Sequence, residues 1–512
     1  MAENYQRLLT LNFLDLHNFI DLSCDEPDKY KLRYYEYWIW QNRLDLQKTF
    51  DINIPAGRKS FLNWCSQSLV GEYGYKGRYI SDDNSLYKAA RSLEYFELKL
   101  KLLNRYLPRC MKHIFNIAWK RYCRNVSWEI IKIFTSKRKK TIKKHQATDN
   151  HQLNIIGYMG RASGVGHHAR NLCRAFDENG IRYKKIDLDQ PSWITELQNN
   201  VPNQINLIAV NADQLIPIYL RSGLTTFEKN YNILYPFWEL SKFPEEWVLS
   251  LEIVDEIWAP TKFIKDAVVA ACKTTTLHMP VALDIPKQSK ISPSNLILRS
   301  DSFVFLTSFD FSSHIVRKNP WAVIKAFRDA FALEDNHVSL VVKTMNEDKD
   351  SNWKNLLKLI ENDPRIQLIQ GVLSYEEVIR LKMSCDCYVS LHRAEGLGMD
   401  PMEAMALCKP VIITNYSGST DYANNENAIP IDYELVDVKP GEYVKFKNQV
   451  WAEPNIQQAS EAMRELARNE IRSNELGKKG FQDISMRHNL NRCGARYSRR
   501  VRDILNKVDE NI

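Results

Sequence analysis

Residues 385–415 read CDCYVSLHRAEGLGMDPMEAMALCKPVIITN, and this stretch decides the fold. Its outer segments, CDCYVSL and PVIITN, are short apolar runs of the kind that form buried parallel strands. Between them lie a loop with two glycines and a helical segment, DPMEAMALC. A strand, a glycine loop and a helix in this order make one unit of a doubly wound α/β sheet. In such units ligands lie at the carboxyl ends of the strands, where free helix amides point out of the sheet.

The same alternation of apolar runs and helical patterns extends from this stretch over most of the chain. A first group of strand-like runs comprises LNIIGYMG (153–160), YKKIDLD (183–189), INLIAVNA (205–212), YNILYPF (231–237) and EIWAP (256–260). A second group comprises SFVFLTSFD (302–310), HVSLVVKTM (337–345), IQLIQG (366–371) and the two runs of the opening stretch. Two such groups in tandem predict an α/β fold with two doubly wound, Rossmann-like domains that face a cleft.

A length of 512 residues also favours several domains. Residues 1–135 are rich in Trp and Tyr, with apolar residues at helical spacing, and predict a helical N-terminal domain of unknown role. A basic linker is expected over 136–152. The first Rossmann-like domain is expected over 153–290 and the second over 291–485. Residues 486–512 should form a C-terminal helix that packs back on the first domain.

Composition and charge exclude several classes of protein. An apolar content of 44% is ordinary for a soluble globular chain, and no apolar run approaches the roughly 20 residues of a membrane-spanning helix. The N-terminus, MAENYQRLLTLNF, lacks the basic and apolar regions of a secretory signal. The ten cysteines lack the spacing of a metal site, so buried thiols in a reduced, cytoplasmic protein are expected.

Two acids and two glycines give the opening stretch its chemistry. Glu395 stands just past a strand, and Gly396 and Gly398 allow the backbone to approach a ligand closely. Asp400 can cap the helix that follows, which places Glu403 in its first turn. Carboxylates accept strong hydrogen bonds from sugar hydroxyls, while loop amides over 396–399 can face a diphosphate. Alone, each acid could be an ordinary surface residue near a helix start.

The whole pattern resembles the E-x7-E signature of the retaining glycosyltransferases of family 4, which have the two-domain GT-B fold. In that family the first Glu meets the transferred sugar and the second meets the ribose of the nucleotide. The resemblance therefore assigns these roles to Glu395 and Glu403. It places Gly396, Leu397, Gly398 and Met399 in the loop that binds the donor. SGSTDY (417–422), which begins at Ser417, and WAEP (451–454) resemble loops that flank the donor site.

A second match is RKNPWAVIKAF, at the start of the helix after the strand VFLTSFD. The family places basic residues there, and Arg317 and Lys318 fill that position. Positive charge is needed there because the leaving nucleoside diphosphate gains negative charge as the glycosidic bond breaks. The family more often has an Arg about six residues before the Lys, where this chain has Ser312. Without the family context, such a pair is commonly a solvated helix face.

The first domain carries the sequence GYMGRASGVGHHARNL after its first strand. Gly164 and Gly166 resemble the glycine-rich loop at which acceptor and donor sugar meet in the family, and His167 could reach the cleft or simply pack. A competing reading is a dinucleotide-binding fingerprint, Gly164-x-Gly166-x-x-Ala169, with Asp187 about 20 residues further on. The long connection from strand to helix favours the glycosyltransferase reading.

YPFWELSKFPEEW (235–247) aligns with a family segment that usually carries a His next to an acid. Here Trp238 and Glu239 stand at those two positions. Because a Trp side chain does not accept a proton, we expect Trp238 to hold a sugar by stacking. Glu239 is then either a polar contact near the reaction centre or a structural acid.

Asp187-Leu188-Asp189 fits a DxD metal motif in form but follows a strand of the first domain, far in sequence from the donor loop. GT-B enzymes generally bind the diphosphate with amides and basic side chains. We therefore expect no required metal and no cofactor, the nucleotide-sugar being a substrate.

The net charge of +8 is concentrated in one region. Residues 99–145 contain fifteen Lys or Arg and one acid, Glu129, interleaved with aromatic residues. This region could lie on an anionic membrane surface, as would suit a lipid-linked acceptor. Nucleic-acid binding is a weaker alternative, and we expect none. Helices with inward aromatics and solvated lysines would explain the pattern equally well.

The sequence as a whole predicts a retaining glycosyltransferase that moves a sugar from a nucleotide-sugar to an acceptor hydroxyl, in glycan or lipid-linked polysaccharide synthesis. The expected location is the cytoplasm, including the inner face of the membrane. The alternative is a non-catalytic GT-B scaffold that acts through residues 1–150.

Overall fold

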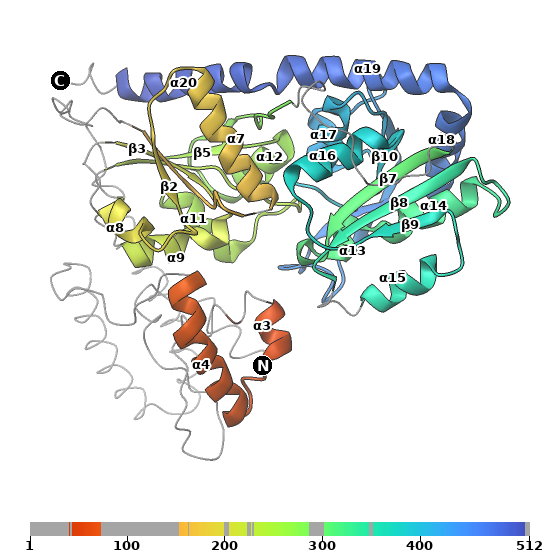
Figure 1. Ribbon diagram of the computed structural model, residues 1–512. Helices are drawn as coiled ribbons and strands as arrows, with labels where there is room; N and C mark the ends of the chain where they lie inside the picture. Colours follow the sequence, from red (N-terminus) through yellow and green to blue (C-terminus); the bar gives the residue numbers. More distant parts are fainter. Residues whose placement is uncertain are drawn as a thin grey trace, which may run out of the picture. The chain divides into compact units, whose positions relative to one another are not determined.

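The structure is a computed structural model, and it describes residues 40, 44–72, 153–161, 163–198, 204–222, 227, 230–285, 302–347 and 352–506 (Figure 1). The chain forms two compact units. The first comprises Met1–Lys140, Pro191–Asn200 and Ile218–Glu228, and the second comprises the rest of the chain. Both large sheets belong to the second unit. No helix among the described residues is long and apolar enough to cross a membrane.

The described part of the first unit contains helices α3 (Leu44–Thr49), α4 (Pro55–Glu72) and α8 (Trp193–Gln198). Phe50, Phe61 and Trp64 form an aromatic cluster, in which Phe61 and Trp64 are stacked at 5.9 Å between ring centroids. Arg58 is buried and donates to the Ile52 carbonyl oxygen at 2.7 Å. The basic region 99–145 and the expected linker 136–152 lie outside the described residues, as does most of the expected helical domain.

The first sheet has six parallel strands in the order β2-β1-β3-β4-β5-β6. Its strands are β1 (Leu153–Gly157), β2 (Lys184–Asp187), β3 (Ile205–Ala209), β4 (Tyr231–Leu234), β5 (Glu256–Ala259) and β6 (Thr276–His278). The helices between them include α7 (Gly164–Glu178), α9 (Ala212–Ser222), α11 (Val248–Glu252) and α12 (Lys262–Ala271). Strands β1 and β3 are buried along their whole length, which explains their near-continuous apolar character.

The second sheet also has six parallel strands, in the order β12-β11-β10-β7-β8-β9. Its strands are β7 (Phe303–Asp310), β8 (Val338–Met345), β9 (Ile366–Ile369), β10 (Cys387–Ser390), β11 (Val411–Thr414) and β12 (Ile429–Ile431). Its helices are α13 (Ile315–Lys318), α14 (Pro320–Ala330), α15 (Asn352–Ile360), α16 (Tyr375–Ser384), α17 (Met399–Ala406) and α18 (Ile456–Arg468). An antiparallel hairpin, β13 (Tyr433–Asp437) and β14 (Val450–Pro454), follows β12.

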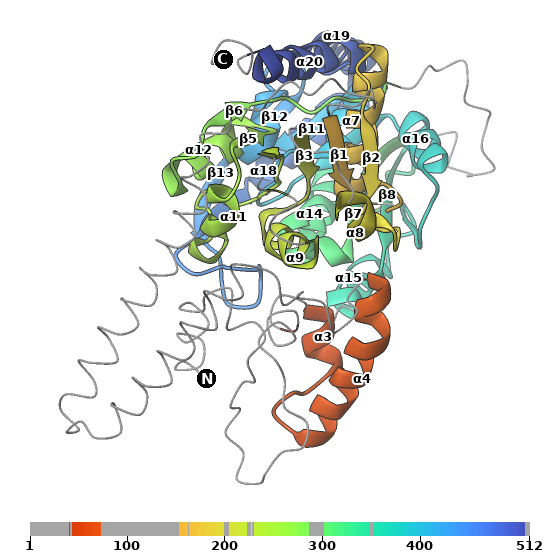
Figure 2. The ribbon, with the colours of Figure 1, turned by 90° about the vertical axis from the view of Figure 1, so that its left-hand side faces the viewer.

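Two long helices end the described chain, α19 (Glu470–Arg487) and α20 (Leu490–Asn506). Both views place them along one end of the two sheets (Figures 1 and 2). Helix α19 packs against α17 of the second sheet, and α20 packs against α7 of the first. Arg500 of α20 donates to the buried Glu256 of β5, with 3.0 Å between Nε and Oε1. The C-terminal helices therefore contact both halves of the second unit.

The predicted fold class is confirmed, because two parallel Rossmann-like sheets stand in tandem. Two local expectations were wrong. WAEP is not a loop but most of β14, and SGSTDY lies largely in a short 3-10 helix, η6 (Ser417–Asp421). Both segments had been interpreted by resemblance to family loops, and neither carries a strong periodic signal of its own.

Candidate active site

The loop after β10 carries Glu395, and a second loop, which opens with Ser417, holds it in place. The Glu395 amide donates to the Ser417 hydroxyl at 2.8 Å, and the Gly418 amide donates to the Glu395 carbonyl oxygen at 2.8 Å. Ser417 adopts a positive φ of 64°, which a non-glycine residue rarely does without surrounding constraint. The backbone on both sides of Glu395 is therefore fixed before any ligand binds.

Glycines allow the two loops to touch. A Cβ atom on Gly418 would lie 1.9 Å from the Gly396 carbonyl oxygen, and one on Gly396 would lie 2.8 Å from the Trp238 carbonyl oxygen. Gly398 has a φ of +81°, and Tyr422 donates to its carbonyl oxygen at 2.7 Å. In this structure the loop glycines bring chain segments together, whereas the sequence argument assigned them to the approach of a ligand.

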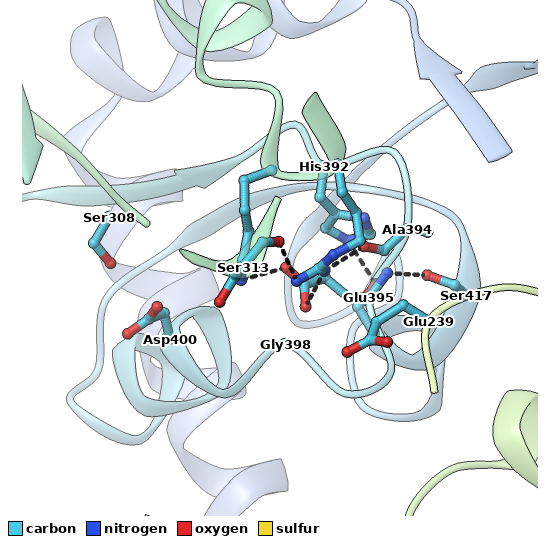
Figure 3. Close-up of polar contacts among 12 residues, drawn as sticks. Glu239, Ser308, Ser313, His392, Ala394, Glu395, Gly398, Asp400 and Ser417 are labelled. Carbon is cyan, nitrogen blue, oxygen red and sulfur yellow. Dashed lines mark hydrogen bonds and ion pairs between the residues drawn. The ribbon is translucent and has the colours of Figure 1, made fainter. Parts of the chain in front are cut away.

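Glu395 lies between two cations (Figure 3). Arg317 Nη1 is 2.9 Å from Oε2, and Lys318 Nζ is 2.6 Å from Oε1. Burial would raise the pKa of Glu395, but Arg317 and Lys318 outweigh burial and hold this pKa well below its usual range. The carboxylate is therefore ionised, and the cluster as a whole carries one excess positive charge.

The two cations differ in the hydrogen bonds they have left. Arg317 is buried, and it also donates to the Ala394 carbonyl oxygen at 2.7 Å and to the Ser313 carbonyl oxygen at 3.3 Å. The Lys318 side chain is 19% exposed, and its ion pair with Glu395 is its only printed side-chain contact. Lys318 can therefore turn toward an anion, while Arg317 is committed to shaping the loop around Glu395.

Glu239 approaches the same cluster from the loop after β4. The Tyr443 hydroxyl donates to Glu239 Oε2 at 2.7 Å, and the guanidinium carbon of Arg317 is 6.0 Å from the centre of the Tyr443 ring. Tyr443 lies in the loop between β13 and β14. Burial raises the pKa of Tyr443 well above its usual value, and the charge of Glu239 adds to this effect. Tyr443 therefore remains a hydrogen-bond donor and connects Glu239 to the Arg317 side of the site.

Trp238 does not take the role expected from sequence. Its side chain is 2% exposed, and the indole N–H donates to the Lys242 carbonyl oxygen at 2.9 Å. The ring packs edge-on against Trp247 and contacts Phe243 and Tyr443. A ring so enclosed offers no face for a sugar to stack on, so the structure makes Trp238 a packing residue.

Glu403 lies one helical turn further from the loop than expected, as the fifth residue of α17. Its Oε2 is 2.5 Å from Nζ of Lys382, a lysine of α16 whose side chain is 1% exposed. Asp400 does not cap α17, because the N-cap position is Gly398 and no side chain caps it. Instead Asp400 accepts from Lys382 at 2.6 Å. The start of α17 is thus held by a buried lysine.

The glycine loop of the first sheet brings His167 to Glu403, with 3.5 Å between Nε2 and Oε1. Gly166 is required where the loop meets α7, because a Cβ atom there would lie 2.4 Å from the Arg161 carbonyl oxygen. Gly164, by contrast, faces open space. Arg170 ties the loop down by donating to the Met159 and Arg161 carbonyl oxygens at 2.9 and 2.8 Å.

Asp187 and Asp189 have local roles in this loop region. Asp187 accepts from the Met159 amide at 2.9 Å, and Asp189 accepts from Arg161 at 2.8 Å. Neither carboxylate is drawn into the cluster around Glu395 by any printed contact.

The predicted site residues thus fall into two contact groups. The first joins Arg317, Lys318, Glu395, Ser417 and Glu239, and the second joins Glu403 and His167. Leu397 is buried in the hydrophobic core, and Met399 begins α17. The sequence argument missed Lys382 and Tyr443. A signal existed for Lys382, a lone cation inside the apolar helical pattern EEVIRLKMS, but Tyr443 lies in a segment with no recognised motif.

Direct contacts link the two sheets near these residues. The Thr261 hydroxyl donates to the Gly396 carbonyl oxygen at 2.9 Å. Asp421 accepts from the Lys262 amide at 2.9 Å and lies 3.0 Å from Nε2 of His278. Residues from the carboxyl ends of strands in both sheets therefore meet around the loop that carries Glu395.

Comparison with known families and structures agrees with this geometry. Residues 308–483 match the sequence model of the family described as "Glycosyl transferases group 1", a range that includes Arg317, Lys318, Glu395 and Glu403. No curated protein matches the chain by sequence.

Solved structures with the same fold share little sequence with this chain. Sucrose-phosphate synthase from Thermosynechococcus elongatus aligns with a TM-score of 0.54 and 12% identity, over 70% of this chain and 100% of that one. Anabaena Alr3699/HepE, solved with UDP and glucose, aligns with a TM-score of 0.51 and 12% identity, over 69% and 99%. S. aureus TarM aligns at a TM-score of 0.44 and 12% identity, and the match spans 58% of this chain and 55% of TarM. Together with the family match, the first two support a glycosyltransferase with the GT-B fold.

Proposed function

We propose that this protein is a retaining glycosyltransferase that transfers a sugar from a nucleotide-sugar to an acceptor hydroxyl, and that it acts in glycan or lipid-linked polysaccharide synthesis. The observation that carries the proposal is the buried Glu395 carboxylate between Arg317 and Lys318, inside the family match. An acid held ionised next to an available lysine suits a sugar on one side and a diphosphate on the other.

The proposed roles follow the hydrogen bonds that each side chain has left. Lys318 meets the diphosphate, aided by the amides of residues 396–399 and by the excess positive charge of the cluster. Glu395 accepts from hydroxyls of the transferred sugar, and Arg317 keeps its carboxylate oriented. Glu403 accepts from the ribose. The resemblance to family 4 supports the assignments of the two acids, and the contacts of Arg317 support its positioning role.

Transfer then proceeds on one face of the sugar. The bond between the anomeric carbon and the phosphate oxygen breaks, and its electron pair stays on the nucleoside diphosphate. The acceptor oxygen forms the new bond to the same carbon, and its proton passes to the departing phosphate. Lys318 stabilises the negative charge that develops there. No catalytic base from the protein is required, and Glu239 remains available as a polar contact for the acceptor.

We infer that the reaction needs no metal, because Lys318 and the loop amides supply the charge stabilisation that a metal would otherwise provide. The test is transfer in EDTA with and without added Mg²⁺ or Mn²⁺. Unchanged rates support the inference. Loss of activity in EDTA that Mn²⁺ restores would overturn it.

The acceptor is expected to be a glycan or a lipid-linked saccharide. The basic region 99–145 would hold the enzyme on the anionic inner surface of a membrane in the cytoplasm. Flotation of the full chain with liposomes that contain or lack phosphatidylserine tests this step. Binding that depends on the anionic lipid supports membrane attachment, and flotation with neither kind of liposome contradicts it.

The donor is tested first by binding. A thermal-shift screen with UDP, GDP and ADP and their glucose and N-acetylglucosamine conjugates should reveal one base that raises the melting temperature, because a ligand that binds the folded state stabilises it. Glu403→Ala should abolish the shift if Glu403 holds the ribose. No response to any nucleotide would favour the alternative, a scaffold acting through residues 1–150.

A further inference from the structure

Lys382 is a buried cation that the roles proposed above do not use. Its side chain is 1% exposed, and its Nζ lies 2.5 Å from Glu403 Oε2 and 2.6 Å from Asp400 Oδ1. Burying an ammonium group is costly unless carboxylates surround it. Burial would lower the pKa of Lys382, but Asp400 and Glu403 outweigh burial and raise it. The lysine is therefore charged, and it connects α16 to the first two turns of α17.

The charge on Glu403 depends on this lysine. Burial raises the pKa of Glu403, Lys382 opposes that rise, and the neighbouring Asp400 adds to it. The net direction is upward even with the lysine present. Removing the ammonium would raise the pKa of Glu403 further, because burial and the charge of Asp400 would then act unopposed.

The two oxygens of Glu403 are not equivalent. Oε2 accepts from Lys382. Oε1 faces His167 Nε2 at 3.5 Å, and within the described ranges no group donates a hydrogen bond to it. His167 Nε2 is itself buried without a hydrogen-bond partner among the described residues. Burial lowers the pKa of His167 to about 4, with further lowering by Arg170, so the ring is neutral near neutral pH. Two unsatisfied polar atoms, one from each sheet region, thus face the same point.

We propose that Lys382 is a positioning residue of the donor site. It holds Oε2 so that Oε1 stays free and ionised to accept a ribose hydroxyl of the nucleotide, and His167 Nε2 contacts the same diol from the other side. This inference rests on the proposed function, because Glu403 meets a ribose only if the donor is a nucleotide-sugar. It adds a positioning residue that the E-x7-E motif does not contain.

Other titratable or charged groups around Glu403 also shape its ionisation. They are Asp400 on α17, Tyr375 on α16, His167, Arg170 and Arg174 on α7, and Asp284 after β6. Asp400 and Lys382 act on Glu403 with opposite sign. Replacing one or the other should therefore shift the pH dependence of nucleotide binding in opposite directions.

The experiment measures the Kd of UDP, GDP and ADP by calorimetry between pH 5.5 and 9, and carries forward the nucleotide that the wild-type protein binds. Lys382→Met should weaken binding about tenfold or more near pH 7, as expected for loss of a charge-assisted hydrogen-bonding group. The loss should grow as the pH falls and shrink as it rises. Asp400→Asn should move the acid-side weakening to lower pH than in wild type. Lys358→Met, at an exposed position of α15, is the matched control and should leave Kd unchanged.

A second background separates this inference from the proposed function. In Glu403→Gln the position no longer titrates, so adding Lys382→Met should produce no further pH dependence. Opposite shifts for Lys382→Met and Asp400→Asn support the positioning role, and if Lys382→Met does not fold, the Asp400→Asn profile decides. Equal losses at every pH, or a wild-type profile in both variants, would overturn it. If Glu403→Gln itself binds nucleotide like wild type, or no nucleotide binds at all, the proposed function fails instead.

Discussion

At the residue scale, Glu395 carries the central claim, and its removal should separate activity from stability. Glu395→Gln deletes the charge between Arg317 and Lys318, so transfer should fall at least about a hundredfold. The buried Arg317 loses its charged partner, which should cost about 3 kcal/mol of the free energy of unfolding. Initial rates and denaturant unfolding measure the two effects.

Asp363→Asn is the matched control for this substitution. Asp363 is another buried, ion-paired acid, 2.8 Å from Arg365 and placed before β9, at the opposite edge of the second sheet. It should lose stability as Glu395→Gln does, yet keep its rate per folded molecule. Equal loss of activity in the two variants would mean that Glu395 acts only through stability.

The two cations beside Glu395 should behave differently when each is removed. Lys318→Ala should raise the KM for the donor and lower kcat, with a change in stability below about 1 kcal/mol, because the lysine is partly exposed. Arg317→Ala should chiefly destabilise the fold, because Arg317 is buried and bonds to Ala394 and Ser313. Steady-state kinetics and thermal unfolding distinguish the two. The reverse pattern would contradict the roles assigned to them.

Sequence predicted which acids and cations would gather, but not how each is used. Motif spacing placed Arg317, Lys318 and Glu395 together, since all three follow adjacent strands, β7 and β10. It did not show that Arg317 spends its hydrogen bonds on backbone carbonyls, because that depends on loop conformation. Trp238 shows the same limit, since whether an indole is exposed or enclosed depends on Phe243, Trp247 and Tyr443 around it.

At the element scale, the glycine loop before α7 offers a test within a few residues. Gly166→Ala should destabilise the protein by about 1–3 kcal/mol, because the new methyl group would collide with the Arg161 carbonyl oxygen. Gly164→Ala has open space and should be neutral or stabilise by about 0.5 kcal/mol. Thermal unfolding compares the two. Equal stabilities would show that the loop does not pack as described.

Strands were more predictable than hairpins and short helices. Three apolar runs of the first sheet each carry an Asn at the second position, and these residues pair across the sheet. Asn154 donates to Asn206 at 2.8 Å, and Asn206 donates to Asn232 at 2.9 Å. The repeated pattern therefore reflects a shared register. Strands β6, β12 and β13 were not predicted, because they are short and only partly buried or exposed, so no continuous apolar run marks them.

At the scale of the whole molecule, buried histidines should make the fold sensitive to acid. Burial lowers the pKa of His167 and of His392 to about 4 and that of His168 to about 3. In the unfolded chain the same side chains take up protons near pH 6.5. Between pH 6.5 and about 4 the unfolded state therefore binds more protons, and the free energy of unfolding should fall as the pH falls.

The slope of this fall should approach about 1.4 kcal/mol per pH unit for each histidine. Ionised Glu395 adds to the loss at still lower pH, whereas Glu403, with its raised pKa, opposes it. His168→Phe is the diagnostic variant, because neither ring nitrogen of His168 has a hydrogen-bond partner among the described residues. Denaturant unfolding from pH 5 to 8 should give this variant a shallower slope than wild type. Identical slopes would contradict the assignment for His168.

The most direct test of the account is turnover of a nucleotide-sugar by the full chain. Purified protein is incubated with the UDP-, GDP- and ADP-sugars, with and without a glycan or lipid-linked acceptor, and release of nucleoside diphosphate is followed. We predict release from donors of one base by the wild-type protein, and release reduced at least about a hundredfold in Glu395→Gln and in Glu403→Ala. No release from any donor, or wild-type release in both variants, would contradict the claim that this loop is the catalytic site of a glycosyltransferase.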